Sequence, residues 1–477
     1  AQKRTIPTDT TVVTNHTTTI KGKKINYTAY TGTQPVWDKE GKPKATLFYT
    51  YYKRTNNVKT AERPLLISFN GGPGSASVWM HLAYTGPNVL KIDDEGYPVQ
   101  PYGYKSNPHS VLDIADIVFV NPVNTGYSRI VERKGKKVNR ADFFGVNADV
   151  RYLAEWITTF VSRNNRWASP KYIIGESYGG TRVSGLANAL QSNQWMYLNG
   201  VILVSPADYK ARGSDDAVSS SIDFPYFTAA AWYHKMLSPT LQNKDLLAIL
   251  PESENFAINS LMPAIAKGGF ISSAEKNQIA EKMSYYTGLS KKVILQHNLE
   301  IPNSFFWKEL LRNKSGKTIG RLDSRYMGID KKEAGDSPDY NSELTSWLHS
   351  FTPAINMYIK EHLNFNTDVK YNMFGPVHPW DWRNNNTREE LRKAMATNPY
   401  LNVLFQAGYY DGATTYFNSK YTMWQLDPSG KLKNRMQFKG YRSGHMMYLR
   451  KPDLKAANDD IRNFIKASSS KGKSAKY

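Results

Sequence analysis

The sequence predicts an α/β fold, in which helices flank a central and mostly parallel sheet on both faces. Short apolar runs alternate with segments of helical periodicity, which is the pattern of such a sheet. Residues from about 210 to 350 break this pattern, because they contain helix-like segments and no clear buried-strand run. We therefore expect a core formed by residues 1–209 and 351–465, a largely helical cap insertion at 210–350, and a basic mobile tail at 466–477.

The strands are expected where β-forming residues cluster. Residues 1–60 look like strands, and Ala45–Lys53 is rich in β-branched and aromatic residues. Pro64–Asn70 and Gly200–Pro206 are short, largely apolar runs, as in buried parallel strands. Further strands are expected at Asp116–Pro122, Lys171–Gly175, Leu401–Ala407 and Met436–Tyr441.

Helices are expected between these strands and in the insertion. Val146–Ser162 carries apolar residues at helical spacing, and Thr181–Gln191 follows the next strand. Ala229–Met236 and Leu241–Leu250 are typical of amphipathic helices in the insertion. A closing helix is expected from about Leu454 to Ile465.

The stretch Gly175-Glu176-Ser177-Tyr178-Gly179 has the Gly-x-Ser-x-Gly spacing of a nucleophile elbow. It joins an expected strand to an expected helix, which is the context that the elbow of an α/β-hydrolase requires. The turn is tight, so small residues must flank the serine, and the following helix places backbone N–H groups near its hydroxyl. The spacing also arises by chance, so the assignment depends on finding the partners of the serine.

A serine nucleophile needs a base, and the base needs an orienting acid. In α/β-hydrolases the chain order is serine, then acid, then histidine. Of the histidines after Ser177, His445 lies in a small-residue loop just after a late strand, while His378 in an aromatic loop is the weaker rival. Asp411 follows the preceding strand and is the candidate acid. An ordinary turn aspartate and a surface-loop histidine are the alternatives.

The glycine-rich turn Asn70–Gly74 follows a buried strand and precedes the elbow. Such a turn can aim a backbone N–H at a developing oxyanion, and the second donor would be the amide of Tyr178. The alternative is a tight structural turn without a ligand. A phosphate-binding loop is not indicated, because the turn lacks a Gly-Lys-Ser/Thr ending and the Gly-x-Gly-x-x-Gly spacing.

The composition excludes some chemistry and some partners. With Cys 0, the chain has no disulfide, thiolate metal site or cysteine nucleophile, and none of the motifs above calls for a metal or another cofactor. No apolar run approaches the ~18 residues of a membrane span, so none is expected. The chain begins at Ala1 without Met, and we expect that a signal peptide was removed before it.

The formal net charge of +21 could attract nucleic acids or anionic surfaces. The excess is spread along the chain, however, with small clusters at Lys21–Lys24, Lys134–Lys137 and the tail. No nucleic-acid motif accompanies it. We therefore expect a solvated basic surface and no nucleic-acid partner.

Four blocks of the chain resemble the signature motifs of the serine carboxypeptidase family. They are Asn70–Ser77, Gly175–Gly180, Gly408–Asp411 and Ser443–Met446, in the order of the family and at intervals of the right size. The weaker blocks Asn107–Ser110, Asn121–Ser128 and Trp380–Trp382 agree with it. The resemblance covers about residues 40–465 and implies an α/β-hydrolase fold with a cap before the acid.

This resemblance implies secreted, vacuolar or lysosomal exopeptidases that release C-terminal residues without a metal. By position, Ser177 would be the nucleophile, His445 the base and Asp411 its partner. The backbone amides of Gly72 and Tyr178 would form the oxyanion hole.

The resemblance also assigns Asn70 and Glu176 to the terminal carboxylate of the substrate. Two carboxylates can share a hydrogen bond only if one of them holds a proton, and a nearby anion raises the pKa of a glutamate above its usual ~4.3. We therefore expect an acidic optimum for peptides, with esters cleaved up to neutral pH. Tyr84 stands where many members carry a supporting glutamate, and Asn124 where a glycine is often found.

We thus expect a serine carboxypeptidase that acts on peptides with a free C-terminus and is secreted or periplasmic. One rival is an esterase or acyltransferase with the same triad, and another is a non-catalytic binding protein that keeps the fold. Asn70 and Glu176 favour peptides, because a neutral ester gains nothing from a carboxylate clamp. Family members are often dimers, which leaves a homodimer open.

Overall fold

The computed structural model describes residues 4–56, 58–133, 138–207, 216–383 and 386–477. The lysine cluster at Lys134–Lys137 and the expected boundary between residues 209 and 210 lie outside the described residues.

Ten strands of the described chain form one sheet, in the order β1-β2-β3-β7-β4-β9-β10-β13-β14, with β8 paired to β3. The strands are β1 (Thr10–Ile20), β2 (Lys23–Trp37), β3 (Pro43–Arg54), β4 (Leu65–Phe69), β7 (Asp116–Val120), β8 (Arg129–Ile130), β9 (Lys171–Glu176), β10 (Gly200–Val204), β13 (Asn402–Gly408) and β14 (Met436–Tyr441). All neighbours from β7 to β14 run parallel, which confirms the predicted mostly parallel sheet.

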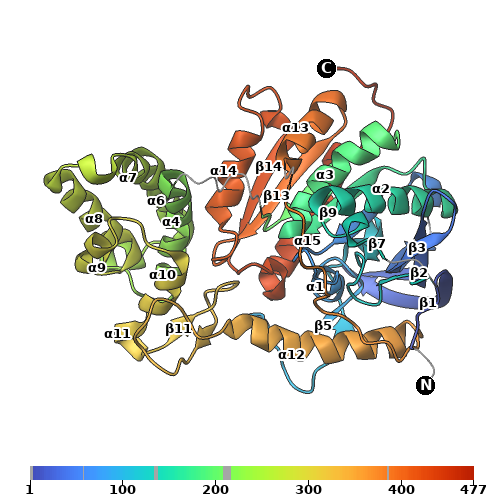
Figure 1. The fold of residues 1–477 in the computed structure, drawn as a ribbon, viewed down its shortest axis with the longest axis horizontal. Coiled ribbons are helices and arrows are strands. Elements are labelled where there is room, and N and C mark those ends of the chain that lie inside the picture. Colours follow the sequence, from blue (N-terminus) through green and yellow to red (C-terminus); the bar gives the residue numbers. More distant parts are fainter. Residues whose placement is uncertain (1–3, 57, 134–137, 208–215, 384–385) are drawn as a thin grey trace.

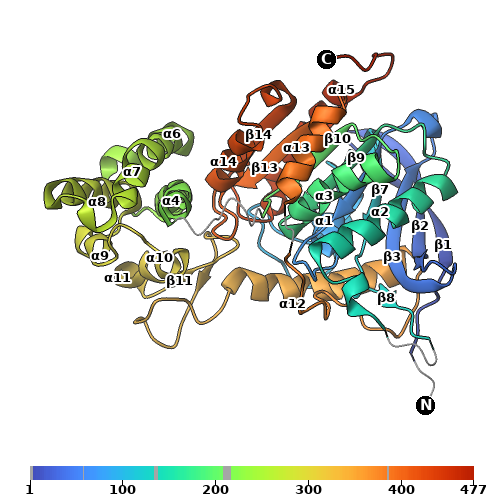
Figure 2. The ribbon, with the colours of Figure 1, turned by 45° about the horizontal axis from the view of Figure 1, so that its top comes forward.

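Helices cover both faces of this sheet (Figures 1 and 2). Side chains alternate along each strand, so that Ile67 packs with α2 and α3 in one hydrophobic cluster, while Leu66 packs with α1, α12 and α15 in the other. These helices are α1 (Val78–Ala83), α2 (Val146–Arg163), α3 (Tyr178–Asn193), α12 (Ser342–Met357), α13 (Thr387–Thr397), α14 (Tyr416–Leu426) and α15 (Lys451–Ser468). Burial on both faces explains why the parallel strands are so apolar.

A largely helical region stands beside the sheet (Figure 1), and its hydrophobic cluster extends to residues of β13 and α14. It contains α4 (Asp216–Tyr233), α5 (Pro239–Gln242), α6 (Leu246–Phe256), α7 (Met262–Ala266), α8 (Ser273–Thr287), α9 (Lys291–Gln296), α10 (Asn303–Glu309) and α11 (Arg312–Ser315). Side-chain oxygens of Asp245, Ser272 and Ser290 cap α6, α8 and α9. The boundaries predicted at residues 210 and 350 stay a prediction, and α12 runs across the second of them.

The helix expected at Ala229–Met236 is the end of the longer helix α4, which starts at Asp216 and stops at Tyr233. Its first part contains serines and Pro225, which have low helix propensity. Burial of Ile222 and Phe224 in the hydrophobic cluster of the helical region overrides that propensity. No helix in the described part of the chain is both long and apolar enough to span a bilayer.

Two short strand pairs lie outside the main sheet. They are β5 (Asn88–Leu90) with β6 (Tyr104–Ser106), and β11 (Thr318–Ile319) with β12 (Met327–Gly328). The segment between β11 and β12 returns from the helical region to the sheet, where Leu322 contacts the loop after β14.

Candidate active site

The carboxyl ends of four parallel strands converge on one cavity of about 310 Å³. Asn70 and Gly72 follow β4, Ser177 follows β9, and His445 lies beyond β14; all four line the cavity. Asp411 follows β13 and is buried directly behind His445. The carboxyl edge of a parallel sheet is the usual place for a ligand site in such folds.

Ser177 lies at a sharp turn between β9 and α3, with φ of 58° and ψ of −124°. A non-glycine residue rarely adopts a positive φ, and such strain is typical of a nucleophile elbow. A Cβ atom at residue 175 would lie 2.1 Å from the carbonyl oxygen of Gly179, so only glycine fits there. The turn holds the half-buried Ser177 at the cavity wall.

His445 and Asp411 form a buried pair, with Nδ1 of the imidazole 2.6 Å from Oδ2 of the carboxylate. The hydroxyl of Thr414 donates to the same Oδ2 at 2.8 Å. Backbone N–H groups of Ala413 and Thr414 donate to the other oxygen, Oδ1. The carboxylate is thus fixed by four contacts and orients the imidazole ring of His445.

Two opposing effects set the pKa of His445. Burial lowers this pKa, but the charge of Asp411 and the hydrogen bond to it outweigh burial, so that the pKa is raised. The negative charge that Glu176 can carry raises it further, and the charge of Arg321 lowers it. The imidazole therefore titrates as part of a coupled group of charges.

The Asn70–Gly72 turn packs closely on the elbow. A Cβ atom at residue 71 would lie 2.5 Å from the amide nitrogen of Tyr178, so glycine permits the close approach of the two backbones. Gly72 has φ of 106°, in the region that favours glycine. The approach brings the turn to the first amide of α3, where the dipole of the helix favours negative charge.

Sequence analysis missed the arginine that holds this turn. Arg182 is fully buried, and its guanidinium donates to the carbonyl oxygens of Asn70 and Pro73 at 2.5 and 3.2 Å. Its Nε donates to Oδ2 of the buried Asp149 at 2.6 Å. One signal was present in the sequence, because Asp149 and Arg182 each interrupt the apolar face of a helix.

Glu176 is buried at the end of β9 and accepts two hydrogen bonds. Nδ2 of Asn70 donates to Oε1 at 3.0 Å, and the hydroxyl of Tyr448 donates to Oε2 at 2.5 Å. Burial outweighs these donors and raises the pKa of Glu176 to about 7. The amide of Asn70 is itself oriented, because the backbone N–H of Met80 donates to its Oδ1 at 3.0 Å. Asn70 and Glu176, which the family resemblance assigns to the same role, therefore lie together beside Ser177.

Tyr84 occupies the position at which many members of the family that the sequence resembles carry a glutamate. Its ring stacks on that of Tyr448 with centroids 4.6 Å apart, and its hydroxyl donates to Gln406 at 2.6 Å. Tyr84 therefore supports Tyr448, which in turn contacts Glu176. Asn124 is the second residue that differs from the family pattern, which often has a glycine there. Its φ of 68° is a conformation that glycine adopts most readily.

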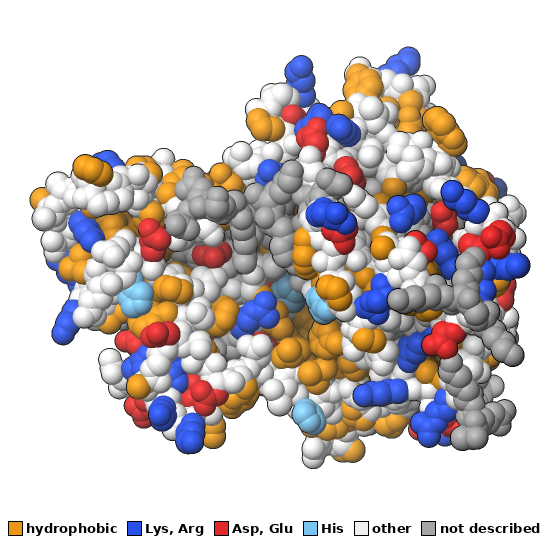
Figure 3. All heavy atoms as spheres, viewed as in Figure 1, with side chains coloured by type: hydrophobic (Ala, Val, Ile, Leu, Met, Phe, Trp, Pro, Cys, Tyr) orange, Lys and Arg blue, Asp and Glu red, His pale blue; other side chains and the backbone are white. Residues whose placement is uncertain are grey.

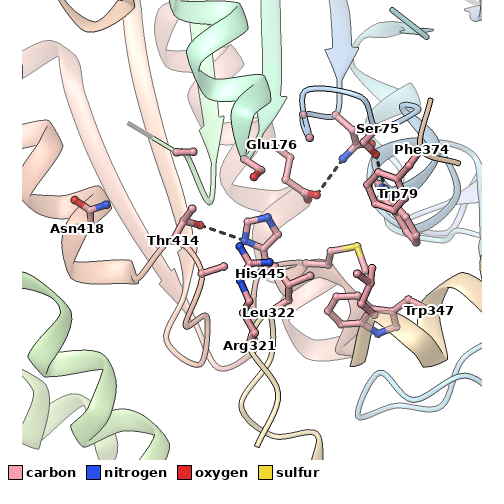
Figure 4. A pocket seen from close by; sticks show the side chains of 18 residues that line it. Ser75, Trp79, Glu176, Arg321, Leu322, Trp347, Phe374, Thr414, Asn418 and His445 are labelled. Atoms are coloured by element: carbon pink, nitrogen blue, oxygen red, sulfur yellow. Dashed lines mark hydrogen bonds between the residues drawn. The ribbon is translucent and has the colours of Figure 1, made fainter. Parts of the chain in front are cut away.

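The walls of the cavity combine apolar and aromatic side chains with polar ones (Figure 4), and hydrophobic side chains gather at the hollow in the middle of Figure 3. Trp79, Trp347 and Phe374 line one end, and Thr414 and Asn418 lie at the other. Arg321 enters from the segment between β11 and β12. Within the described ranges, no cluster of three or more His, Cys, Asp or Glu is arranged to hold a metal ion.

Comparison with known proteins points to one family. The profile of the serine carboxypeptidases matches residues 21–452. Serine carboxypeptidase-like 8 of Arabidopsis thaliana is 29% identical over 170 residues, which are 34% of this chain and 37% of the relative. Vitellogenic carboxypeptidase of Aedes aegypti is 28% identical over 155 residues, 32% of this chain and 30% of the relative. The matched segments thus span only about a third of the length of these relatives.

Among solved structures, the chain resembles Kex1(delta)p, a prohormone-processing carboxypeptidase from Saccharomyces cerevisiae. The TM-score is 0.56 with 14% sequence identity, and the match covers 92% of each chain. At this identity the likeness shows the fold alone, which is the predicted α/β-hydrolase fold.

Proposed function

Because the chain belongs to the serine carboxypeptidase family, we propose that it hydrolyses the last peptide bond of peptides with a free C-terminus. The observation that carries this proposal is the pair Asn70 and Glu176 beside Ser177 in one cavity. An amide donor and a carboxyl group with a pKa of about 7 form a site for a terminal carboxylate. An enzyme for neutral esters has no use for such a pair.

In the proposed reaction, Oγ of Ser177 attacks the carbonyl carbon of the last peptide bond, and His445 takes the proton of the hydroxyl. Asp411 keeps the imidazole in the required tautomer and stabilises the imidazolium. The C–N bond then breaks, and His445 gives the proton to the leaving amine. Water attacks the acyl-enzyme by the same route, and the serine recovers its proton.

We assign the oxyanion hole to the backbone N–H groups of Gly72 and Tyr178. Charge develops on the carbonyl oxygen only in the transition state, so preorganised donors there lower the barrier selectively. Removal of one such donor typically costs about 10²–10³ in kcat. The contacts of Arg182 to the Asn70–Pro73 turn support this role, because they fix the turn that carries one donor.

The terminal carboxylate of the substrate would bind to Nδ2 of Asn70 and to protonated Glu176. Only the neutral form of Glu176 can donate to an anion, so the clamp works below the pKa of about 7. This is the physical basis of the acidic optimum expected for peptides. We further propose that the enzyme acts outside the cytoplasm, as a secreted or periplasmic protein, and that residues 210–350 form a cap.

A mass-spectrometric time course tests the proposed activity. A peptide with a blocked N-terminus is incubated at pH 5 with the enzyme and with the Ser177→Ala variant. Stepwise loss of residues from the free C-terminus by the wild type alone is the expected result. Hydrolysis of simple esters without loss of any residue would instead assign the site to an esterase or acyltransferase.

A further inference from the structure

Arg321 places a cationic side chain in the catalytic cavity. Of the described residues that line the cavity, it is the only lysine or arginine. Figure 4 shows the side chain of Arg321 extending toward His445, on the side opposite to Glu176. The positive charge of Arg321 acts on His445, because it lowers the pKa of the imidazole.

The backbone around Arg321 is fixed to both catalytic loops. Its carbonyl oxygen accepts from the N–H of Gly412 at 3.0 Å, next to Asp411 in the chain. The following carbonyl, of Leu322, accepts from the N–H of His445 at 2.7 Å. Glu343 at the start of α12 accepts from the N–H of Leu322 at 2.8 Å. The base of the arginine side chain therefore has a set position relative to the reacting atoms.

The guanidinium of Arg321 forms no ion pair or hydrogen bond with the residues that the structure describes. Arg325 pairs with Asp323, and Arg442 pairs with Asp245, but no such pair or side-chain hydrogen bond holds the exposed Arg321. Burial raises the pKa of the neighbouring Glu343 to about 7, so this carboxyl is mostly neutral at acidic pH. The positive charge of Arg321 is thus available to a ligand.

We propose that Arg321 selects peptides with an acidic side chain on one of the two residues that flank the bond to be cut. This inference rests on the proposed carboxypeptidase function. In that function Asn70 and Glu176 bind the terminal carboxylate, and Glu176 lies on the other side of His445 from Arg321. Arg321 is therefore left for a second carboxylate of the substrate. A planar guanidinium binds a carboxylate through two parallel hydrogen bonds, which fix the orientation of the carboxylate as well as its position.

The overall charge of +21 also attracts acidic peptides, so a local effect must be separated from long-range attraction. Arg151 on α2 provides the matched control, because it is exposed and does not line the cavity. Arg151→Gln removes one positive charge from the surface, as Arg321→Gln does, but leaves the site intact. Long-range attraction also weakens with salt, whereas the local contact is screened much less.

The test measures kcat/KM at pH 5 for four blocked peptides, with Glu or Gln at the last or at the penultimate position. Glu and Gln have nearly the same shape, so their ratio isolates the charge. We expect the wild type to prefer Glu over Gln at one of the two positions by about ten- to hundredfold. The position that shows this preference identifies the subsite that contains Arg321. Arg321→Gln should abolish the preference, Arg321→Glu should reverse it in favour of Gln, and Arg151→Gln should keep it.

Equal rates for Glu and Gln at both positions in the wild type would overturn the inference while leaving the proposed function intact. The same holds for an unchanged preference in Arg321→Gln. Failure to release a residue from any of the four peptides would count against the proposed function itself. A change in the pKa of His445 alters all four rates together, so it does not mimic the expected change in the ratio.

Discussion

The hydroxyl of Tyr448 donates to Oε2 of Glu176 at 2.5 Å, and both side chains are buried. Asn70 occupies the other oxygen of the carboxyl group. Burial nevertheless raises the pKa of Glu176 to about 7, so the group changes its charge near neutral pH. Beside the proposed nucleophile Ser177, Glu176 would therefore make the binding of an anionic substrate depend on pH.

Replacement of Glu176 by glutamine tests this pH dependence. In the proposed clamp of the wild type, neutral Glu176 binds the substrate carboxylate below pH 7, and the anionic form repels it above. We expect KM for a peptide to rise about tenfold for each pH unit above the pKa, because the neutral fraction falls by that factor. An amide does not ionise, so Glu176→Gln should flatten this rise. A steep rise that persists in the variant would contradict the assignment.

Removal of the Tyr448 hydroxyl tests the contact with Glu176 directly. The hydrogen bond from Tyr448 favours the ionised carboxylate and lowers its pKa, so Tyr448→Phe should move the rise in KM to higher pH. Tyr84→Phe is the matched control, since it keeps the stacked ring and removes a hydroxyl that donates to Gln406 instead. The shift is measured from the dependence of peptide KM on pH. Equal shifts in both variants would show that the Tyr448 hydroxyl has no specific effect on the pKa of Glu176.

Asp411→Asn removes the charge that supports His445 while keeping the shape of the side chain. We expect kcat to fall by about 10⁴-fold, because the imidazole loses its orienting charge and its required tautomer. The pKa of His445 should also fall, since Asp411 raises it in the wild type. Single-turnover kinetics measures the first effect and NMR titration of the imidazole the second. A variant with nearly normal kcat would exclude Asp411 as the acid.

The buried pair Arg182 and Asp149 offers a test of stability apart from catalysis. Arg182→Met leaves Asp149 buried without its partner, which should lower the free energy of unfolding by about 3–5 kcal/mol. Adding Asp149→Leu removes the stranded charge and should restore most of that loss. Activity should stay low in both variants, because the Asn70–Pro73 turn has lost its donors. Denaturant unfolding and kcat together separate the two effects, and full activity in the stable double variant would count against a catalytic role for the turn.

The sheet and the candidate triad could be predicted from the sequence because both impose residue types at fixed places. Parallel strands buried on both faces leave apolar runs, and the elbow needs small residues around Ser177. Asp411 follows such a run, His445 follows the edge strand β14, and the chain order of α/β-hydrolases restricts the choice. The fold class and the family were therefore predicted correctly.

The contacts that tune the site were not predictable in the same way. Arg321 belongs to a segment without a motif, and its place depends on how the chain returns from the helical region to the sheet. Tyr448 follows His445 closely, but no pattern indicates that its hydroxyl points at Glu176. The early start of α4 depends on burial in a cluster whose members lie far apart in the chain.

The proposed carboxylate clamp can be tested most directly with one peptide in two forms. We would measure kcat/KM at pH 5 for a blocked peptide with a free C-terminal carboxylate and for the same peptide as the C-terminal amide. Binding at Asn70 and neutral Glu176 predicts a preference for the free acid of about ten- to hundredfold, which Glu176→Ala should abolish. Equal rates for the acid and the amide would contradict a carboxypeptidase that recognises the chain terminus at this site.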